Sequence, residues 1–171
     1  MKYGLVIKVL SRCTLNYISK LLQALKLQKI THGHRHEKGK CRTTYLKELV
    51  EKLDLSTQVM FFKDITDDLK NSLIAKSDIF VMPSIIYKTS VEGFGIAYVE
   101  AAQYGIPSLG GKDGGASDAI EHNKTGLICD GNNLDDIYSS LNSMIENKKY
   151  LEFGKNAKEF VSKFQWKKIL E

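Results

Sequence analysis

Two glutamates, Glu92 and Glu100, stand eight positions apart around a glycine pair in the stretch SVEGFGIAYVEAAQYGIPSLGGKDGGASD. Gly93 and Gly95 flank Phe94 where a helical pattern begins, so the main chain can approach a ligand closely and direct N–H groups at it. A helix N-terminus favours an anion, and phosphate is the usual one. Carboxylates bind phosphate poorly but accept hydrogen bonds from sugar hydroxyls. The stretch therefore predicts a site for a ligand with a phosphate centre and polyol ends.

The separation of the two glutamates fits such a ligand. At a helical rise of about 1.5 Å per residue, eight residues span roughly 12 Å, which is close to the reach of a sugar, a diphosphate and a ribose in a row. A simpler interpretation stays open, in which Glu92 interacts with the helix dipole and Glu100 is an exposed helical residue.

A second glycine set, GGKDGGASD, follows the next predicted strand and precedes a short helix. It repeats the same geometry on the neighbouring turn, where Gly114 and Gly115 would let the chain pass close beneath a diphosphate. The alternative is a flexible loop followed by an ordinary helix N-cap at Ser117.

The elements that must position these residues alternate along the chain. Apolar runs predict strands at residues 4–12, 59–62, 78–82, 106–109 and 126–129. Helical patterns lie at residues 15–25, 45–53, 67–76, 95–103, 117–122, 134–146 and 150–164. This alternation predicts an α/β fold with a parallel sheet that helices cover on both faces. Parallel sheets bind ligands beyond the carboxyl ends of their strands, and both glycine sets follow such ends.

Length and composition set the class of protein. With 171 residues, 43% of them apolar, the chain is the size of one domain with a real core. No apolar run approaches the roughly 18 residues that a membrane span needs, and the N-terminus lacks the pattern of a signal peptide. Three irregularly spaced cysteines fit reduced thiols. We therefore expect a cytoplasmic protein.

The net charge of +5 is unevenly distributed. Residues 1–52 carry twelve Lys/Arg and three Asp/Glu, and the rest of the chain carries thirteen and seventeen. A basic front end suits a polyanion, a phosphorylated ligand or an anionic membrane surface, at which the protein would be peripheral. The simpler interpretation is a solvated lysine-rich surface. A basic nucleic-acid-binding module is the rival from another class, but no recognised motif accompanies the charge, so we expect no nucleic-acid partner.

A histidine cluster, His32, His34 and His36 with Cys41 nearby, invites a zinc interpretation. The spacing matches no established zinc pattern, and a polar loop is the favoured interpretation. We therefore predict no metal site.

Four motifs occur in order: PS at 83–84, EGFGIAYVEAAQYGIP at 92–107, GGASDAI at 114–120 and NKTGLI at 123–128. Together they resemble the C-terminal, donor-binding domain of retaining GT-B glycosyltransferases of family four, the glycosyl transferases of group 1. The similarity covers about residues 55–165, and GGASD is most similar to mannosyltransferase-like and polysaccharide-assembly members. The resemblance implies a Rossmann-like domain that forms one half of a GT-B fold.

The resemblance also implies a donor site for a nucleotide-diphosphate sugar, with no metal and no further cofactor. Glu92 would be the catalytic residue at the donor sugar, and Glu100 would bind the ribose. The amides of Phe94, Gly95 and Ile96 would hold the diphosphate. Ile65 would lie near the base, and Arg12 would neutralise the diphosphate. The implied donor-binding residues are Arg12, Ile65, Gly93, Phe94, Gly95, Ile96, Glu100, Gly114 and Gly115.

The sequence departs from this family pattern in two respects. Tyr17 stands where the family places a lysine five residues after Arg12, and a lost cation of this kind could cost several kcal/mol of barrier. GT-B enzymes also have two domains of similar size, and this chain has room for one. We therefore expect residues 1–171 to form a single nucleotide-sugar-binding domain, divergent over 1–44, without the N-terminal acceptor domain.

The expected function is retaining transfer of a hexosyl group to a glycan or lipid-linked acceptor once an N-terminal domain completes the enzyme. Three origins of the chain stay open: an excised domain, a fragment of a split or decayed gene, or a subunit whose separate partner chain carries the N-terminal domain. The alternative within the same fold is a catalytically inactive fragment that still binds nucleotide sugar.

Overall fold

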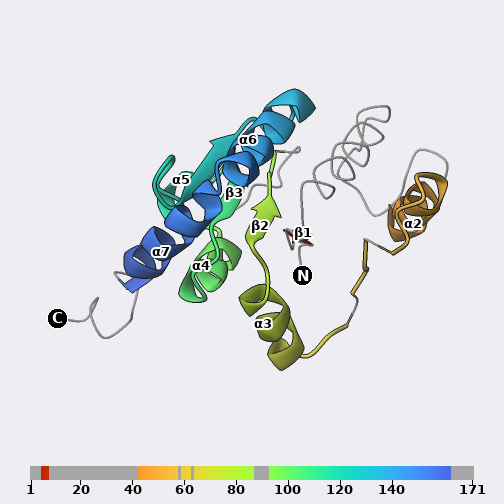
Figure 1. Ribbon diagram of the computed structural model, residues 1–171, viewed down its shortest axis with the longest axis horizontal. Helices are drawn as coiled ribbons and strands as arrows, with labels where there is room; N and C mark the ends of the chain where they lie inside the picture. Colours follow the sequence, from red (N-terminus) through yellow and green to blue (C-terminus); the bar gives the residue numbers. More distant parts are fainter. Residues whose placement is uncertain (1–4, 8–41, 58, 63, 87–92, 163–171) are drawn as a thin grey trace. The chain divides into compact units, whose positions relative to one another are not determined.

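The computed structural model describes residues 5–7, 42–57, 59–62, 64–86 and 93–162 (Figure 1). The chain divides into two compact units, one made of residues 1–9 with 66–171 and the other of residues 10–65. The first unit holds the sheet and both glycine sets.

The sheet has four strands in the order β1 (Leu5–Ile7), β2 (Ile79–Met82), β3 (Ser108–Gly111) and β4 (Gly126–Cys129). Strands β2, β3 and β4 are parallel, as predicted, with Val81 opposite Leu109 and Leu109 opposite Leu127. Strand β1 differs from the prediction because it pairs with β2 antiparallel. Residues 8–78 connect β1 to β2, and a connection of that length permits either direction. The remainder of the predicted first strand lies outside the described residues.

Helices precede, connect and follow the three parallel strands. They are α2 (Arg42–Lys52), α3 (Asp67–Ala75), α4 (Ile96–Gln103), α5 (Ala116–Ala119), α6 (Leu134–Glu146) and α7 (Lys149–Val161). Helix α2 lies in the second unit and the others in the first. Helix α7 packs against α4, α6 and β4, and both α4 and α5 pack against β3.

Both faces of β2 are buried, which confirms a sheet covered on two sides. Successive side chains of a strand point to opposite faces, so Phe80 and Met82 face one side while Ile79 and Val81 face the other. All four are between 0% and 8% exposed. Phe80 and Met82 belong to one apolar cluster with residues of α3, α4 and α5, including Ile74, Tyr98, Ala101 and Ala116.

Side-chain caps explain where two of the helices begin. The Thr66 hydroxyl accepts the Leu69 N–H at 3.3 Å, and Asn133 Oδ1 accepts the N–H groups of Asp135 and Asp136 at 3.0 and 3.3 Å. Each helix also carries aspartates in its first turn, where the helix dipole favours negative charge.

Three predicted elements are wrong in detail. Residues 59–62 form no strand, because β propensity without a pairing partner does not make one. Strand β3 begins at Ser108 rather than 106, since Pro107 has no N–H to donate to the ladder. Helix α5 has Gly115 as its N-cap, and Ser117 lies inside its first turn.

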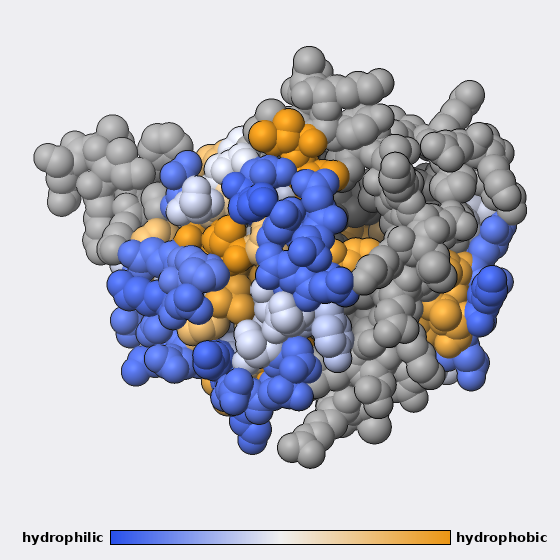
Figure 2. Space-filling view, turned by 90° about the horizontal axis from the view of Figure 1, so that it is seen from above, coloured by the Kyte–Doolittle hydropathy of each residue, from blue (hydrophilic) through white to orange (hydrophobic). Residues whose placement is uncertain are grey.

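Among the described residues seen in Figure 2, hydrophilic side chains cover most of the surface, and apolar residues show in groups between them. Across the described residues, none of the helices combines the length and apolar character needed to cross a membrane.

Candidate functional site

Helix α4 begins at Gly95, whose φ of 79° lies in the left-handed region that glycine adopts without strain. A Cβ at Gly95 would also lie 2.8 Å from Cε2 of Tyr98, so the ring occupies the space of a side chain. The Tyr98 hydroxyl donates a 2.5 Å hydrogen bond to the Met82 carbonyl, and its ring meets that of Phe80 edge to face at 5.9 Å. Tyr98 therefore fixes the start of α4 against the carboxyl end of β2.

The first turn of α4 presents main-chain N–H groups at this edge of the sheet. No side chain of the described residues caps the helix, and the Tyr98 N–H donates to the Gly95 carbonyl at 2.9 Å. For the N–H groups of Ile96 and Ala97, no acceptor is found among the described residues. These groups carry the positive end of the helix dipole. The turn has the chemistry to bind an anion.

The second glycine set touches the first directly. A Cβ at Gly115 would collide with the Gly93 carbonyl oxygen and would lie 3.0 Å from Phe94 Cα. Only glycine allows the two main chains to approach this closely. Gly114 has a φ of 87° just before this contact. The two turns therefore form one continuous main-chain surface, as their positions after neighbouring strands predict.

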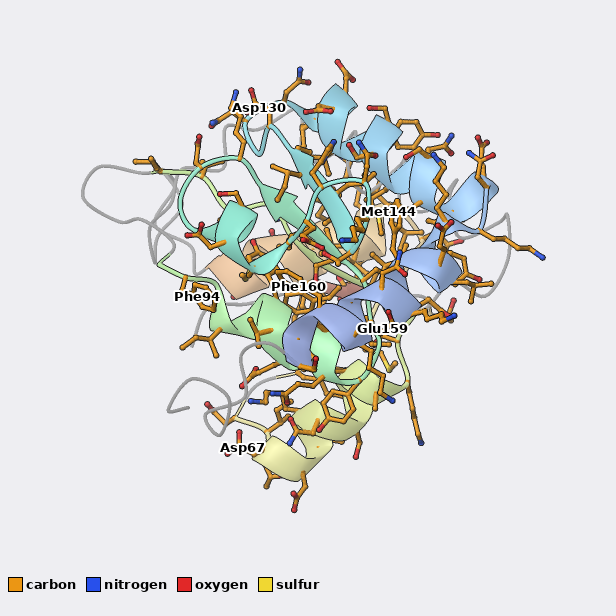
Figure 3. All side chains as sticks on the ribbon, turned by 90° about the vertical axis from the view of Figure 1, so that its left-hand side faces the viewer. Asp67, Phe94, Asp130, Met144, Glu159 and Phe160 are labelled. Atoms are coloured by element: carbon orange, nitrogen blue, oxygen red, sulfur yellow. The ribbon has the colours of Figure 1, made fainter. Side chains whose placement is uncertain are left out.

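The loop after β2 packs against the ends of the other two parallel strands. A Cβ at Gly111 would lie 2.7 Å from the Ser84 nitrogen, and one at Gly131 would lie 2.6 Å from the Pro83 carbonyl oxygen. Figure 3 shows Phe94, Asp67 and Asp130 along the same side of the chain. The carboxyl ends of β2, β3 and β4 and the starts of α3 and α4 therefore share one edge.

An ion pair at this edge is absent from the sequence-based prediction. Lys112 Nζ lies 2.7 Å from Asp130 Oδ2, and the Asn132 N–H donates to Asp130 Oδ1 at 2.9 Å. The hydrogen bond from Lys112, aided by the one from Asn132, holds the pKa of Asp130 below its ordinary value. The register could have revealed the pair, because Gly111 pairs with Cys129 and the two charged residues follow them directly.

A second ion pair involves one of the predicted site residues. Lys70 Nζ lies 3.1 Å from Glu100 Oε1 and 3.4 Å from Asp67 Oδ1. The hydrogen bond to Glu100 is the main reason why the pKa of Lys70 is raised. Lys70 carries no role in the sequence-based prediction, and no spacing rule links two residues 30 positions apart.

The structure brings together most of the predicted donor-binding residues. Gly93, Phe94, Gly95, Ile96, Glu100, Gly114 and Gly115 all lie in the first unit at the carboxyl edge of the parallel strands. Ile65 ends the second unit. Arg12 and Glu92 lie outside the described residues.

The assumption behind the length estimate, that all residues between the two glutamates are helical, is wrong, because the chain becomes helical only at Ile96. The distance itself involves Glu92, which lies outside the described residues. At about 1.5 Å per residue, the helical part from Ile96 to Glu100 covers roughly 6 Å. The non-helical residues before it follow no such rule.

No cluster of three or more His, Cys, Asp or Glu residues able to hold a metal ion occurs within the described ranges. His32, His34, His36 and Cys41 lie outside them. Burial raises the pKa of the Cys129 thiol to about 12, and its sulfur lies 3.4 Å from the Gly110 carbonyl oxygen. A thiol that stays protonated is unreactive.

Residues 16–160 match the family described as glycosyl transferases group 1. A GDP-mannose-dependent alpha-(1-6)-phosphatidylinositol monomannoside mannosyltransferase of Mycobacterium tuberculosis is 30% identical over 125 residues, which are 71% of this chain and 32% of that protein. The sulfoquinovosyl transferase SQD2 of Arabidopsis thaliana is 29% identical over 71% of this chain and 24% of its own length. The chain thus spans about a third or less of the curated relatives it matches.

Two solved structures show the same arrangement. Anabaena Alr3699/HepE in complex with UDP and glucose superposes with a TM-score of 0.61 at 26% identity, covering 71% of this chain and 32% of that one. The C-terminal domain of a glycosyl transferase group 1 family protein, LpcC of Francisella tularensis, superposes with a TM-score of 0.65 at 22% identity, covering 90% of this chain and 80% of that one. The latter likeness confirms the Rossmann-like α/β fold.

Proposed function

We propose, from the premise that this chain belongs to the glycosyl transferases of group 1, that it is the donor-binding half of a retaining hexosyltransferase. In this proposal it binds a nucleotide-diphosphate sugar at the carboxyl edge of its parallel strands. The match to an isolated C-terminal domain of the same family supports the C-terminal placement.

The contact between the two glycine turns carries the proposal. Gly115 abuts the main chain of Gly93 and Phe94, beside a helix start whose Ile96 and Ala97 N–H groups have no acceptor in the described parts of the chain. A diphosphate is an elongated anion that needs several donors along its length, and a continuous main-chain surface with a helix dipole offers them. Anabaena Alr3699/HepE, a structural neighbour, binds UDP and glucose.

The remaining roles follow from this position of the diphosphate. Glu100 would accept hydrogen bonds from the ribose hydroxyls, one helical turn into α4, and Gly114 with Gly115 would border the phosphates. Glu92 would act at the donor sugar, Arg12 would offset the diphosphate charge, and Ile65 would lie near the base.

Transfer itself would also require an N-terminal domain. That domain would supply the acceptor site for a glycan or lipid-linked acceptor. The basic residues 1–52 would suit a peripheral position at the inner face of a membrane, with the protein otherwise cytoplasmic.

Calorimetric titration of UDP, GDP, UDP-glucose and GDP-mannose tests the proposal. We expect at least one nucleotide to bind, and Glu100→Gln to weaken both that nucleotide and its sugar conjugate. The loss should be about tenfold, the cost of one hydrogen bond to a charged group. Glu92→Gln should weaken only the sugar conjugate, and Glu146→Gln, an exposed change at the end of α6, should change neither.

Two outcomes would contradict the proposal. Absence of binding by all four compounds would reject the donor site. Retention on heparin or oligonucleotides that falls steeply with salt, without any effect of a nucleotide sugar, would favour a nucleic-acid-binding module instead. Binding without transfer after addition of an N-terminal domain would indicate the inactive fragment.

A further inference from the structure

We propose that Lys70 is a positioning residue for the nucleotide, which holds the Glu100 carboxylate in the orientation that meets the ribose hydroxyls. The inference rests on the proposed function, because it requires Glu100 to face the nucleotide.

The two residues come from different elements that the core fixes in place. Lys70 lies one turn before Ile74 on α3 and therefore on the same face of that helix. Ile74 is 5% exposed and packs in the cluster that contains Tyr98 and Ala101 of α4. Glu100 is the neighbour of Ala101, so the packing that holds α3 against α4 also sets Lys70 opposite Glu100.

The contact is short and partly shielded from water. Lys70 Nζ and Glu100 Oε1 are 3.1 Å apart, and the side chains are 30% and 37% exposed. This hydrogen bond is the main cause of the raised pKa of Lys70, so the contact favours the charged ammonium. Asp67 Oδ1 lies 3.4 Å from the same ammonium and gives the lysine a second anionic partner.

An oriented carboxylate binds a diol better than a mobile one. A glutamate side chain loses rotamer freedom when it is fixed, and a residue that is already ordered does not incur that loss on binding. Lys70 engages Oε1, and an ionised carboxylate has about four acceptor positions. Glu100 therefore keeps the capacity to accept hydroxyl hydrogens while its direction is set from α3.

The experiment compares Lys70→Met and Lys70→Arg with the parent chain. UDP and GDP are titrated by calorimetry, together with their 2′,3′-dideoxy analogues, which lack the hydroxyls that Glu100 would bind. We expect Lys70→Met to weaken the ribonucleotide about fivefold and to leave the Kd of the dideoxy analogue unchanged. Lys70→Arg, which can keep the ion pair, should remain within about twofold of the parent.

Lys124→Met provides a matched control. Lys124 forms a 3.0 Å pair with Glu121 just before β4, at the opposite end of the parallel strands, and its removal should change no Kd. Circular dichroism of each variant confirms that the fold is kept.

The possible results separate the two proposals. If the parent binds neither UDP nor GDP, the proposed function fails and this inference with it. If the parent binds and Lys70→Met weakens the ribonucleotide and the dideoxy analogue equally, Lys70 has only a structural role. If Lys70→Met leaves ribonucleotide binding unchanged or tightens it, the ion pair does not orient Glu100 for ribose. In both latter cases the donor site stands and the positioning role is overturned.

Discussion

Alanine substitutions at the two glycines that form the contact between the turns should have different effects. Gly115→Ala should lower stability, whereas Gly93→Ala should keep stability and lower the affinity for nucleotide. Gly115 has a φ of −85°, which any residue adopts, so the cost of Gly115→Ala is steric alone. Its Cβ would collide with the Gly93 carbonyl oxygen and lie 2.8 Å from the Gly93 carbonyl carbon. These are main-chain atoms that cannot rotate away. Gly93 differs, because a Cβ there would meet no atom of the described residues within 4 Å.

The magnitudes follow from these contacts. Overpacking a well-packed site lowers the free energy of unfolding by about 1 to 3 kcal/mol. For a domain of this size each kcal/mol lowers Tm by roughly 2 to 4 °C, so Gly115→Ala should melt about 2 to 12 °C below the parent. Gly93→Ala should stay within about 0.5 kcal/mol of the parent, as changes in open space usually do.

The assay pairs thermal unfolding with calorimetric titration of the nucleotide that the parent binds. Gly93→Ala should keep the parent Tm and lose affinity, because its methyl group occupies space through which the diphosphate would approach the main chain. A Gly115→Ala variant that melts with the parent would refute the contact between the turns. A Gly93→Ala variant that binds like the parent would refute close approach of the ligand at this residue.

Three further results are expected. Tyr98→Phe should lower the free energy of unfolding by about 1 kcal/mol, measured by urea titration, because it removes the hydrogen bond to Met82. The depressed pKa of Asp130 contributes stability above its unfolded pKa of about 3.9, which is lost as the pH falls through the folded pKa. In Lys112→Met this contribution should be smaller, so the free energy of unfolding should fall less as the pH is lowered. An unchanged dependence of the free energy of unfolding on pH would refute the pairing. In a chain whose other two cysteines are replaced by serine, Cys129 should resist iodoacetamide at pH 8 until the protein unfolds, since its folded pKa is about 12. The same shift means that the free energy of unfolding falls as the pH rises from about 8.5, the pKa of the unfolded thiol, towards 12. Labelling at the rate of an exposed thiol would contradict this burial.

The elements that the sequence predicts well are those whose signals are local. Strand β4 and helix α6 occur at the predicted residues, because the apolar run 126–129 is short and bounded and Asn133 caps the helix with its own side chain. Strand β3 shows the limit of such signals. It ends in Gly110 and Gly111, which have poor strand propensity, and only its pairing with β2 and β4 makes it a strand.

In the candidate site, too, the features with local sequence signals were predictable and those that depend on packing were not. The glycine turns were predictable, because glycines that follow strands and precede helices indicate close approach of the main chain. The Gly115 contact with Gly93 depends on the parallel pairing of β2 and β3 and on the backbone conformation of each turn. The spacing of residues in the sequence does not predict either of these. The ion pair of Lys70 with Glu100 depends on how α3 packs against α4, through side chains such as Ile74 and Tyr98 that carry no charge signal.

The two glycine turns contact each other through main-chain atoms, and this determines which mutations the surface between them would tolerate. Every amino acid except proline supplies the same amide, so most replacements around the turns change side chains and leave the main-chain surface intact. Sensitivity should then concentrate at Gly95 and Gly115, where an added carbon meets other atoms, and at Gly93, where it would occupy the approach of the diphosphate. A saturation screen for retention of the nucleotide that the parent binds should accordingly show a few intolerant positions among many tolerant ones.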